Sequence, residues 1–345
     1  MQNVVIDVEE GGLSSSLVFD PSGNPAVSYC GEGFLSSRQA ECRPGGLRYV
    51  HFRGTSWDIE SIDTEGYSDT SLAFHLSGNP CISYIAGAAY HDKHLKYAQF
   101  NGSSWDIETV DSIGVSGANS CLALDSDGNP GISYCCGDNL KFTYFNGISW
   151  HMEIVDSGNI GCTSLKFNSL ENPVIAYGQE GELKYACFNG ISWHIETVDS
   201  LKIIKEGVGA GNSLAFDRSG NSGIAYYRVA GVFSGEGELR YAHFNGISWD
   251  IEIVDDNVSR GGQKCSLAFD AKGHPAIAYV DSSGVDKLKY AHFNGISWDI
   301  ETIDYARGCC GQSTSLAFTR RGEPAISYYG NELLKFATKS RRLIK

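Results

Sequence analysis

The stretch YAHFNGISWDIE occupies Tyr241–Glu252 and recurs unchanged at Tyr290–Glu301. Variants of this phrase account for all 6 tryptophans of the chain. A second phrase, of the type SLAFD followed by GNPAISY, lies upstream of each copy. A catalytic site is normally assembled once, so a phrase repeated along a chain describes its architecture. Seven copies of the second phrase end in Tyr29, Tyr84, Tyr134, Tyr177, Tyr226, Tyr279 and Tyr328.

Each repeat is predicted to hold four short strands, A to D. In the unit around Trp105 these strands cover 71–74, 81–84, 95–100 and 105–110. Large residues alternate with small ones, and turn-forming residues interrupt every few positions, which indicates strands rather than helices. The GNP and NGSS stretches are typical of tight hairpin turns. Four antiparallel strands repeated at roughly 50-residue intervals predict a β-propeller.

The chain ends before a seventh tryptophan phrase can follow. Residues 315–337 supply strands A, B and C of a last blade, and the opening NVVIDVEE matches strand D. We therefore expect an N-terminal strand at 3–9 to pair with 315–337, which closes one all-β, seven-bladed domain over 1–345. Closure would remove two sheet edges that otherwise invite aggregation. The match sets Val5 and Val8 in the places of Ile107 and Val110.

Composition narrows the partners. Lys plus Arg number 27 against 41 Asp plus Glu, a formal charge of −14, so a nucleic-acid backbone would be repelled. No apolar run of about 18 residues predicts a membrane span. The N-terminus lacks a basic-then-apolar signal segment, so the chain is either cytoplasmic or has lost a leader. We expect no cofactor.

The 11 cysteines are an odd number, so at least one thiol lacks an intramolecular partner. Cys30 and Cys42 bracket an insertion that a disulfide could close, with a stabilisation of about 3 kcal/mol. If the turn of the third unit is centred on SDGN, Cys121 lies across from Cys135 as a second candidate pair. Small buried thiols are the alternative. A thiolate metal site lacks CxxC spacing, and we predict no metal site.

Three His–Asp pairs suggest part of a catalytic triad, but they recur in three blades. A nucleophile, base and orienting group must converge at one place, so structural cross-strand pairing is favoured and no catalytic residue is predicted. The pairs are His51 with Asp58, His243 with Asp250, and His292 with Asp299.

Two further positions recur in every blade. A basic residue follows Leu in strand C and is expected to make a rim or inter-blade contact. The tyrosines that end strand B could instead ring a ligand, although packing explains a sevenfold recurrence better. The basic residues are Arg48, Lys96, Lys141, Lys184, Arg240, Lys289 and Lys335.

The parts that differ between blades point to function. The B–C and D–A connections vary in length, and both emerge on one face, as expected when a rigid scaffold carries a binding surface on its loops. Lys166 also departs from the repeat, because it replaces a small residue in strand A of the fourth unit; it is either a structural ion-pair member or a ligand contact. The predicted ligand-binding residues are Tyr90, His91, His94, Lys166, Arg228 and Phe233.

Read as a composite, SLAFDPSGNPAISYY…LKYAHFNGISWDIETVD resembles the tandem-repeat propellers of secreted or surface proteins of bacteria and archaea. It is more distantly similar to lectin propellers. The resemblance covers the whole chain and implies an extracellular or cell-surface location. Sialidase-like propellers are disfavoured, because their Ser-x-Asp-x-Gly-x-x-Trp order is absent from FNGISWDIE.

We expect a non-catalytic scaffold that binds a protein or glycan through the face made by the B–C and D–A connections. A glycan hydrolase or lyase with its site at the channel mouth on that face is the first alternative. A structural subunit of a larger assembly is the second. The sequence leaves the oligomeric state open.

Overall fold

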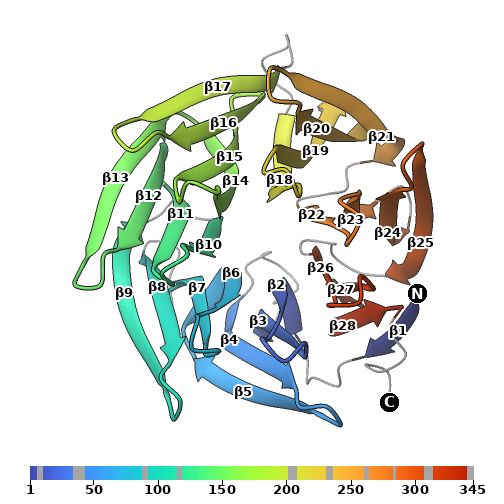
Figure 1. Cartoon of the computed structure of the whole chain (residues 1–345). Helices are drawn as coiled ribbons and strands as arrows, with labels where there is room; N and C mark the ends of the chain where they lie inside the picture. The colour runs from blue at the N-terminus through green and yellow to red at the C-terminus, as the bar shows by residue number, and fades with distance from the viewer. Residues whose placement is uncertain are drawn as a thin grey trace.

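The computed structural model is a ring of seven four-stranded antiparallel sheets, the blades, around a central axis (Figure 1). It describes residues 1–5, 11–33, 43–87, 92–114, 119–200, 208–230, 236–259, 264–282, 285–306 and 314–339. The predicted all-β, seven-bladed propeller is confirmed. Within this described part, no helix has the length and apolar character needed to cross a membrane.

In blades I to VI, the strands run in chain order from the inner strand A to the outer strand D. Blade I holds β2 (Gly11–Phe19), β3 (Pro25–Gly33), β4 (Arg43–Phe52) and β5 (Trp57–Asp63). Blade II holds β6 (Gly66–Phe74), β7 (Pro80–Ala86), β8 (Lys93–Phe100) and β9 (Trp105–Gly114). Blade III holds β10 (Ser120–Leu124), β11 (Pro130–Cys136), β12 (Asn139–Phe145) and β13 (Trp150–Ser157). Blade IV holds β14 (Ile160–Phe167), β15 (Pro173–Gln179), β16 (Glu182–Phe188) and β17 (Trp193–Ser200). Blade V holds β18 (Val208–Phe216), β19 (Ser222–Ala230), β20 (Glu236–Phe244) and β21 (Trp249–Ser259). Blade VI holds β22 (Ser266–Phe269), β23 (Pro275–Asp281), β24 (Asp286–Phe293) and β25 (Trp298–Ala306). Blade VII holds β26 (Thr314–Phe318), β27 (Pro324–Gly330), β28 (Leu333–Thr338) and, as its outer strand, β1 (Gln2–Val5).

Side chains that accept hydrogen bonds from the backbone fix both hairpin turns of a blade. In the A–B turn of blade V, Asp217 Oδ1 accepts the backbone N–H of Asn221 at 2.9 Å. In the C–D turn, Asn245 Oδ1 accepts the N–H groups of Ile247 and Ser248, each at 3.0 Å. Asp and Asn commonly stabilise turns in this way. The repeated GNP and NGIS phrases are therefore the hairpin turns that the sequence predicts.

Strand B forms the buried centre of each blade, and its tyrosine hydroxyl links neighbouring blades. Tyr84 donates to Asp63 Oδ2 of blade I at 2.6 Å, and Lys96 Nζ donates to the same oxygen at 2.9 Å. The recurring basic residue therefore makes the predicted inter-blade contact here, and full burial of the seven tyrosines supports their packing role. The same Tyr–Asp–basic link joins five further blade pairs: Tyr134–Asp111–Lys141, Tyr177–Asp156–Lys184, Tyr226–Asp199–Arg240, Tyr279–Asp255–Lys289 and Tyr328–Asp304–Lys335.

The tryptophan that begins strand D packs across the blade interface. The ring of Trp249 meets Tyr185 of the preceding blade edge-on, with centroids 5.2 Å apart, and its Nε1 donates to Glu196 Oε1 at 2.8 Å. Trp298 packs on Tyr241 in the same way at 5.6 Å. Both tryptophans are half-buried, so they seal the outer part of each interface rather than its centre.

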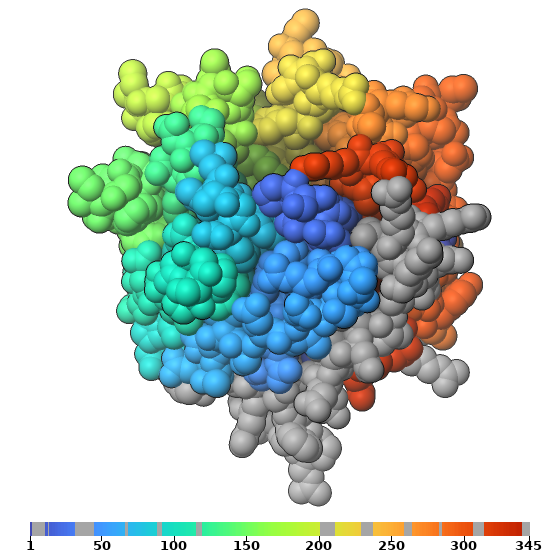
Figure 2. Space-filling view, turned by 60° about the horizontal axis from the view of Figure 1, so that its bottom comes forward, coloured from blue at the N-terminus to red at the C-terminus, as the bar shows by residue number. Residues whose placement is uncertain are grey.

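The N-terminal strand closes the ring, as predicted. Strand β1 pairs antiparallel with β28, with Gln2 opposite Thr338 and Val5 opposite Lys335. Blade I also contacts blade VII directly: the Gly11 N–H donates to the backbone oxygen of blade VII residue 332 at 3.2 Å. The blue and red segments accordingly adjoin in the space-filling view (Figure 2).

The predicted register of this strand is wrong by two residues. Val5 was expected in the place of Ile107, which lies opposite Ala98, but it takes the place of Thr109, which lies opposite Lys96. A slip of two residues leaves every side chain on the same face of the sheet, so the hydrophobic pattern does not distinguish the two registers. The other expected match, Val8, lies outside the described residues.

Candidate ligand-binding cavities between blades

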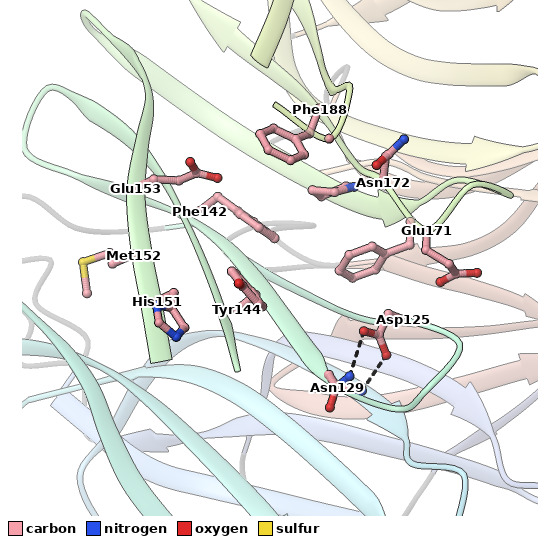
Figure 3. A pocket seen from close by; sticks show the side chains of 13 residues that line it. Asp125, Asn129, Phe142, Tyr144, His151, Met152, Glu153, Glu171, Asn172 and Phe188 are labelled. Carbon is pink, nitrogen blue, oxygen red and sulfur yellow. Dashed lines mark hydrogen bonds between the residues drawn. The ribbon is translucent and has the colours of Figure 1, made fainter. Parts of the chain in front are cut away.

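Two cavities open between neighbouring blades, on the side of the A–B and C–D turns. Cavity 1, of about 510 Å³, lies between blades III and IV (Figure 3), and cavity 2, of about 410 Å³, lies between blades V and VI. The lining of cavity 1 includes Asp125, Phe142, Tyr144, His151 and Glu153 from blade III, and Phe167, Glu171 and Phe188 from blade IV.

Both cavities are built from the same positions of the repeat. Phe142 and Glu153 face each other across β12 and β13 in cavity 1, and Tyr241 and Glu252 are the corresponding pair across β20 and β21 in cavity 2. In each case, the following blade adds residues of its strand A, its A–B turn and the end of its strand C. The repeat thus produces one kind of cavity at two blade interfaces, with different side chains in each.

Cavity 1 has an aromatic wall. Tyr144 and His151 lie opposite each other in β12 and β13, and their rings stack with centroids 5.4 Å apart and an interplanar angle of 27°. Phe142 lies two residues before Tyr144 and therefore on the same face of the strand, while Phe188 lines the cavity from blade IV (Figure 3). Tyr144 is 43% exposed, so its side chain is accessible to a ligand.

Carboxylates supply the negative charge of cavity 1, beside the polar side chains of Asn129, Asn172 and His151. Asn129 donates to both oxygens of Asp125, through its backbone N–H at 2.7 Å and its side chain at 2.9 Å. Glu171 of blade IV accepts a backbone N–H from the blade III turn at 2.9 Å, and Glu153 accepts a hydrogen bond from Trp193 at 3.0 Å. No Lys or Arg is present among the described residues that line this cavity. The cavity therefore suits hydrogen-bond donors and repels anions.

Cavity 2 combines acidic and imidazole groups. Its lining includes Asp217, Glu252, His243 and His274, and His243 Nε2 lies 3.0 Å from Asp217 Oδ2. Burial raises the pKa of Asp217, but hydrogen bonds from His243 and Asn221 outweigh burial and hold that pKa below its ordinary value. Asp217 is therefore ionised at neutral pH and available as an acceptor.

Sequence reasoning missed Tyr144 and His151, although they depart from the repeat. They occupy the positions at which three other blades have a His and an Asp in register across strands C and D, as predicted. The predicted cross-strand pairing of each His with its Asp is therefore confirmed, but the hydrogen bond of each imidazole goes to the aspartate that anchors the A–B turn. Nε2 lies 3.0 Å from that carboxylate in His51–Asp20, His243–Asp217 and His292–Asp270.

An ion pair crosses the centre of the ring. Lys264 Nζ lies 2.6 Å from Asp69 Oδ1 and joins blades VI and II, which are not neighbours. Asp69 Oδ2 also accepts the Asn119 N–H and the Ser68 hydroxyl, each at 3.0 Å. Burial raises the pKa of Asp69, but Lys264 and these hydrogen bonds outweigh burial and lower it. With these partners the carboxylate is a structural brace rather than a reactive group.

The predicted ligand-binding residues do not gather in either cavity. His94 lies at the start of β8 with Nε2 3.0 Å from Asp92, and Arg228 lies in β19 with a guanidinium nitrogen 3.7 Å from Glu238. Lys166 is exposed on the inner strand β14. These positions belong to blades II, V and IV. Tyr90, His91 and Phe233 lie outside the described residues, and the predicted loop surface stays a prediction.

No disulfide joins any two of the eight described cysteines. The predicted pairing of Cys121 with Cys135 is wrong, because the hairpin register sets Leu124 opposite Pro130. Cys121 therefore lies opposite Ser133. Cys30 is buried, whereas Cys42 lies outside the described residues, so their bridge stays a prediction.

Comparison with known proteins gives a likeness of fold. No protein family and no curated protein matches the sequence. A polysaccharide lyase described as an ulvan lyase has a TM-score of 0.63 and 11% identity, over 98% of this chain and 96% of its own. A variant of the Aleuria aurantia lectin in complex with alpha-methyl-L-fucoside has a TM-score of 0.56 and 13% identity, over 87% and 97%. A sialidase of Streptococcus pneumoniae has a TM-score of 0.51 and 10% identity, over 99% and 71%. Lectins and glycan-cleaving enzymes thus share this architecture.

Proposed function

We propose that this protein is a non-catalytic glycan-binding propeller that holds sugar rings in the cavities between its blades. The observation that carries the proposal is the recurrence of one kind of cavity, with aromatic residues beside carboxylates, at two blade interfaces. A sugar presents apolar C–H faces and hydroxyl donors, and aromatic faces with fixed carboxylates complement both. Two such cavities on one rigid ring favour a multivalent ligand, because linked sites raise avidity.

The proposed surface lies on the A–B and C–D turns, whereas the sequence favoured the B–C and D–A loops. The turns keep the same length from blade to blade, so the length variation that favoured the B–C and D–A loops is absent there. The cavities arise from side chains of two adjacent blades, which only the packed ring brings together. The fold likeness to a lectin with a bound fucoside supports a sugar as the ligand class.

Charge favours a neutral glycan over an anionic one. Cavity 1 presents Asp125, Glu153 and Glu171, its described lining contains no Lys or Arg, and the whole chain has a formal charge of −14. A uronate or sulfated sugar would be repelled there. A lyase that removes a proton beside a uronate must stabilise the negative charge that develops, and the described lining offers no Lys or Arg for that, only the imidazole of His151. Binding is therefore a better account of cavity 1 than lyase chemistry.

A glycan array that contains neutral and anionic glycans tests this proposal with the full chain. We expect signal on neutral glycans. For the best neutral glycan, Tyr144→Ala should weaken binding by about 5- to 30-fold, which corresponds to about 1–2 kcal/mol for loss of an aromatic contact. The matched control is Ile148→Ala, in the C–D turn of the same blade, where the side chain is 88% exposed and does not line the cavity.

Two results would contradict the proposal. One is equal loss of affinity in Tyr144→Ala and Ile148→Ala, or in neither. The other is formation of new unsaturated ends when anionic polysaccharides are incubated with the protein, because that would establish lyase activity. Unchanged melting temperatures of both variants would show that altered binding does not arise from unfolding.

A further inference from the structure

The A–B turn of blade VI differs from those of blades I and V at one informative position. Blades I and V carry an Asn four residues after the turn aspartate, and the Asn side chain donates to that carboxylate at 3.1 Å from Asn24 and 3.2 Å from Asn221. Blade VI has His274 at this position. The backbone turn is the same, because the Asp270 N–H donates to the His274 carbonyl at 2.9 Å, as the Asp217 N–H does to that of Asn221.

The substitution brings a third potential ligand to an existing His–Asp pair. Asp270 Oδ2 lies 3.0 Å from His292 Nε2 and 3.7 Å from His274 Nδ1, and the three ligand atoms lie within 4.8 Å of one another. The two imidazoles are about one-third exposed and the carboxylate is mostly buried. In contrast to the Asn side chains of blades I and V, His274 makes no hydrogen bond to the carboxylate at this distance.

These spacings fit a tetrahedral ion. Zn²⁺ binds imidazole nitrogen and carboxylate oxygen at about 2.0–2.1 Å, which sets neighbouring ligand atoms about 3.3 Å apart. The distances from Asp270 Oδ2 to His292 Nε2, 3.0 Å, and to His274 Nδ1, 3.7 Å, lie on either side of that value. Two His and one carboxylate are also the donor set that zinc uses where a fourth position stays open.

The surroundings hold the carboxylate in place for this role. Asp270 Oδ1 accepts the backbone N–H groups of Lys272 at 2.7 Å and His274 at 2.9 Å, which leaves Oδ2 for the two imidazoles. Fixing of ligands by outer hydrogen bonds is a general feature of metal sites.

We propose that blade VI binds a divalent transition-metal ion through Asp270 Oδ2, His274 Nδ1 and His292 Nε2. The site adjoins cavity 2, because His274 lines that cavity, so an ion there leaves a coordination position for water or a ligand group beside it. The sequence did not indicate this site, since its ligands come from a turn and a separate strand. Blades I and V, with Asn at the third position, do not form it.

Titration of the chelator-treated full chain with Zn²⁺ by calorimetry tests the site. The wild-type chain should bind one more Zn²⁺ ion than the His274→Asn variant, or bind the same ion at least about 100-fold more tightly. Loss of a residue that only supports a ligand weakens metal affinity by about 10–100-fold, so loss of a ligand itself should weaken it at least as much. Free thiols are common to both proteins, so their contribution cancels in the comparison. Without metal, the two should melt alike, because Asn occupies this turn position in blades I and V.

A reciprocal variant tests the same site by a gain of metal binding rather than by a loss. Asn221→His places the third ligand beside Asp217 and His243, whose atoms already lie 3.0 Å apart, and should add one Zn²⁺ per chain. Co²⁺ bound at either site should show a tetrahedral visible spectrum without thiolate charge-transfer absorption. Equal stoichiometry and affinity of wild type and His274→Asn would overturn the proposal. Failure of a folded Asn221→His variant to gain an ion would also overturn it, because the three-residue set would then be insufficient.

Discussion

Replacement of Lys264 by Met should destabilise the fold by much more than an ordinary substitution of a lysine. The ammonium lies 2.6 Å from Asp69 Oδ1, and its side chain is 30% exposed while that of Asp69 is 9% exposed. Met retains most of the aliphatic side chain and removes only the charge. The variant therefore leaves the Asp69 carboxylate buried at the centre of the ring, with two hydrogen-bond donors but without the ammonium that contacts it directly; Lys93 remains as an electrostatic partner.

The expected magnitude follows from the burial of the acid. Breaking a buried pair from one side typically costs about 3–5 kcal/mol, and partial exposure of the lysine puts the expected loss near about 3 kcal/mol. The double variant Lys264→Met with Asp69→Asn removes both charges, so it should be more stable than the sum of the single losses predicts. Asn is the replacement of choice, because Asp69 has a φ of 53° and Asn tolerates that left-handed region.

Urea unfolding followed by tryptophan fluorescence measures these differences. The matched control is Lys339→Met, since Lys339 lies 3.0 Å from Glu301 in a pair whose side chains are 49% and 40% exposed. Such a surface pair contributes about 0–1 kcal/mol. If Lys264→Met were no more destabilising than Lys339→Met, or if the double variant showed simple additivity, the ion pair would not brace the ring as argued.

Three further outcomes are expected. Acid should weaken the fold below about pH 4. Hydrogen bonds from Tyr279 and Lys289 outweigh burial and lower the folded-state pKa of Asp255 below its unfolded-state value. The stability that ionised Asp255 contributes is therefore present above the unfolded-state pKa and is lost as pH falls through the folded-state pKa. Asp255→Asn should flatten that dependence in urea midpoints measured against pH, and an unaltered slope would contradict it. Deletion of residues 1–5 removes β1 and exposes β28, so light scattering should detect more aggregate than in wild type; equal solubility and melting would count against the closure. Trp249→Ala should cost about 3 kcal/mol, at the low end for a large aromatic residue because this one is half-buried, and a urea midpoint within error of wild type would rule out a packing role.

The repeat made the architecture predictable from sequence, because every blade carries the same large-and-small alternation and the same turn residues. The position of Tyr84 in its phrase, for example, was enough to predict a packed residue, although not the hydrogen bond from its hydroxyl to Asp63. The registers of paired strands were harder to predict from the sequence. The predicted position of Val5 and the predicted partner of Cys121 were each wrong by two residues. A shift of two residues along a strand keeps every side chain on the same face, so the alternation of large and small residues does not reveal it.

The candidate sites were poorly predicted for a physical reason. A cavity between blades needs side chains from two units about 50 residues apart, and their proximity depends on how the sheets pack rather than on any local pattern. Tyr144 and His274 do signal their importance as departures from the repeat. The variable length of the B–C and D–A connections led instead to His94 and Arg228 as predicted ligand-binding residues, and each of them pairs with a neighbouring carboxylate. Substitutions inside constant-length turns are thus as informative as insertions in variable loops.

Closure of the ring by β1 also changes how the molecule can come apart. In an open array of repeats, the end units have one neighbour each and unravel first. Here each of six blade pairs shares an aspartate of one blade with a tyrosine and a basic residue of the next, and β1 leaves no blade at an end. At the seventh interface, within the described residues, the buried Tyr29 hydroxyl lacks an acidic partner. The ring is thus held closed by the non-covalent pairing of β1 with β28, and we expect unfolding to begin with the loss of this pairing.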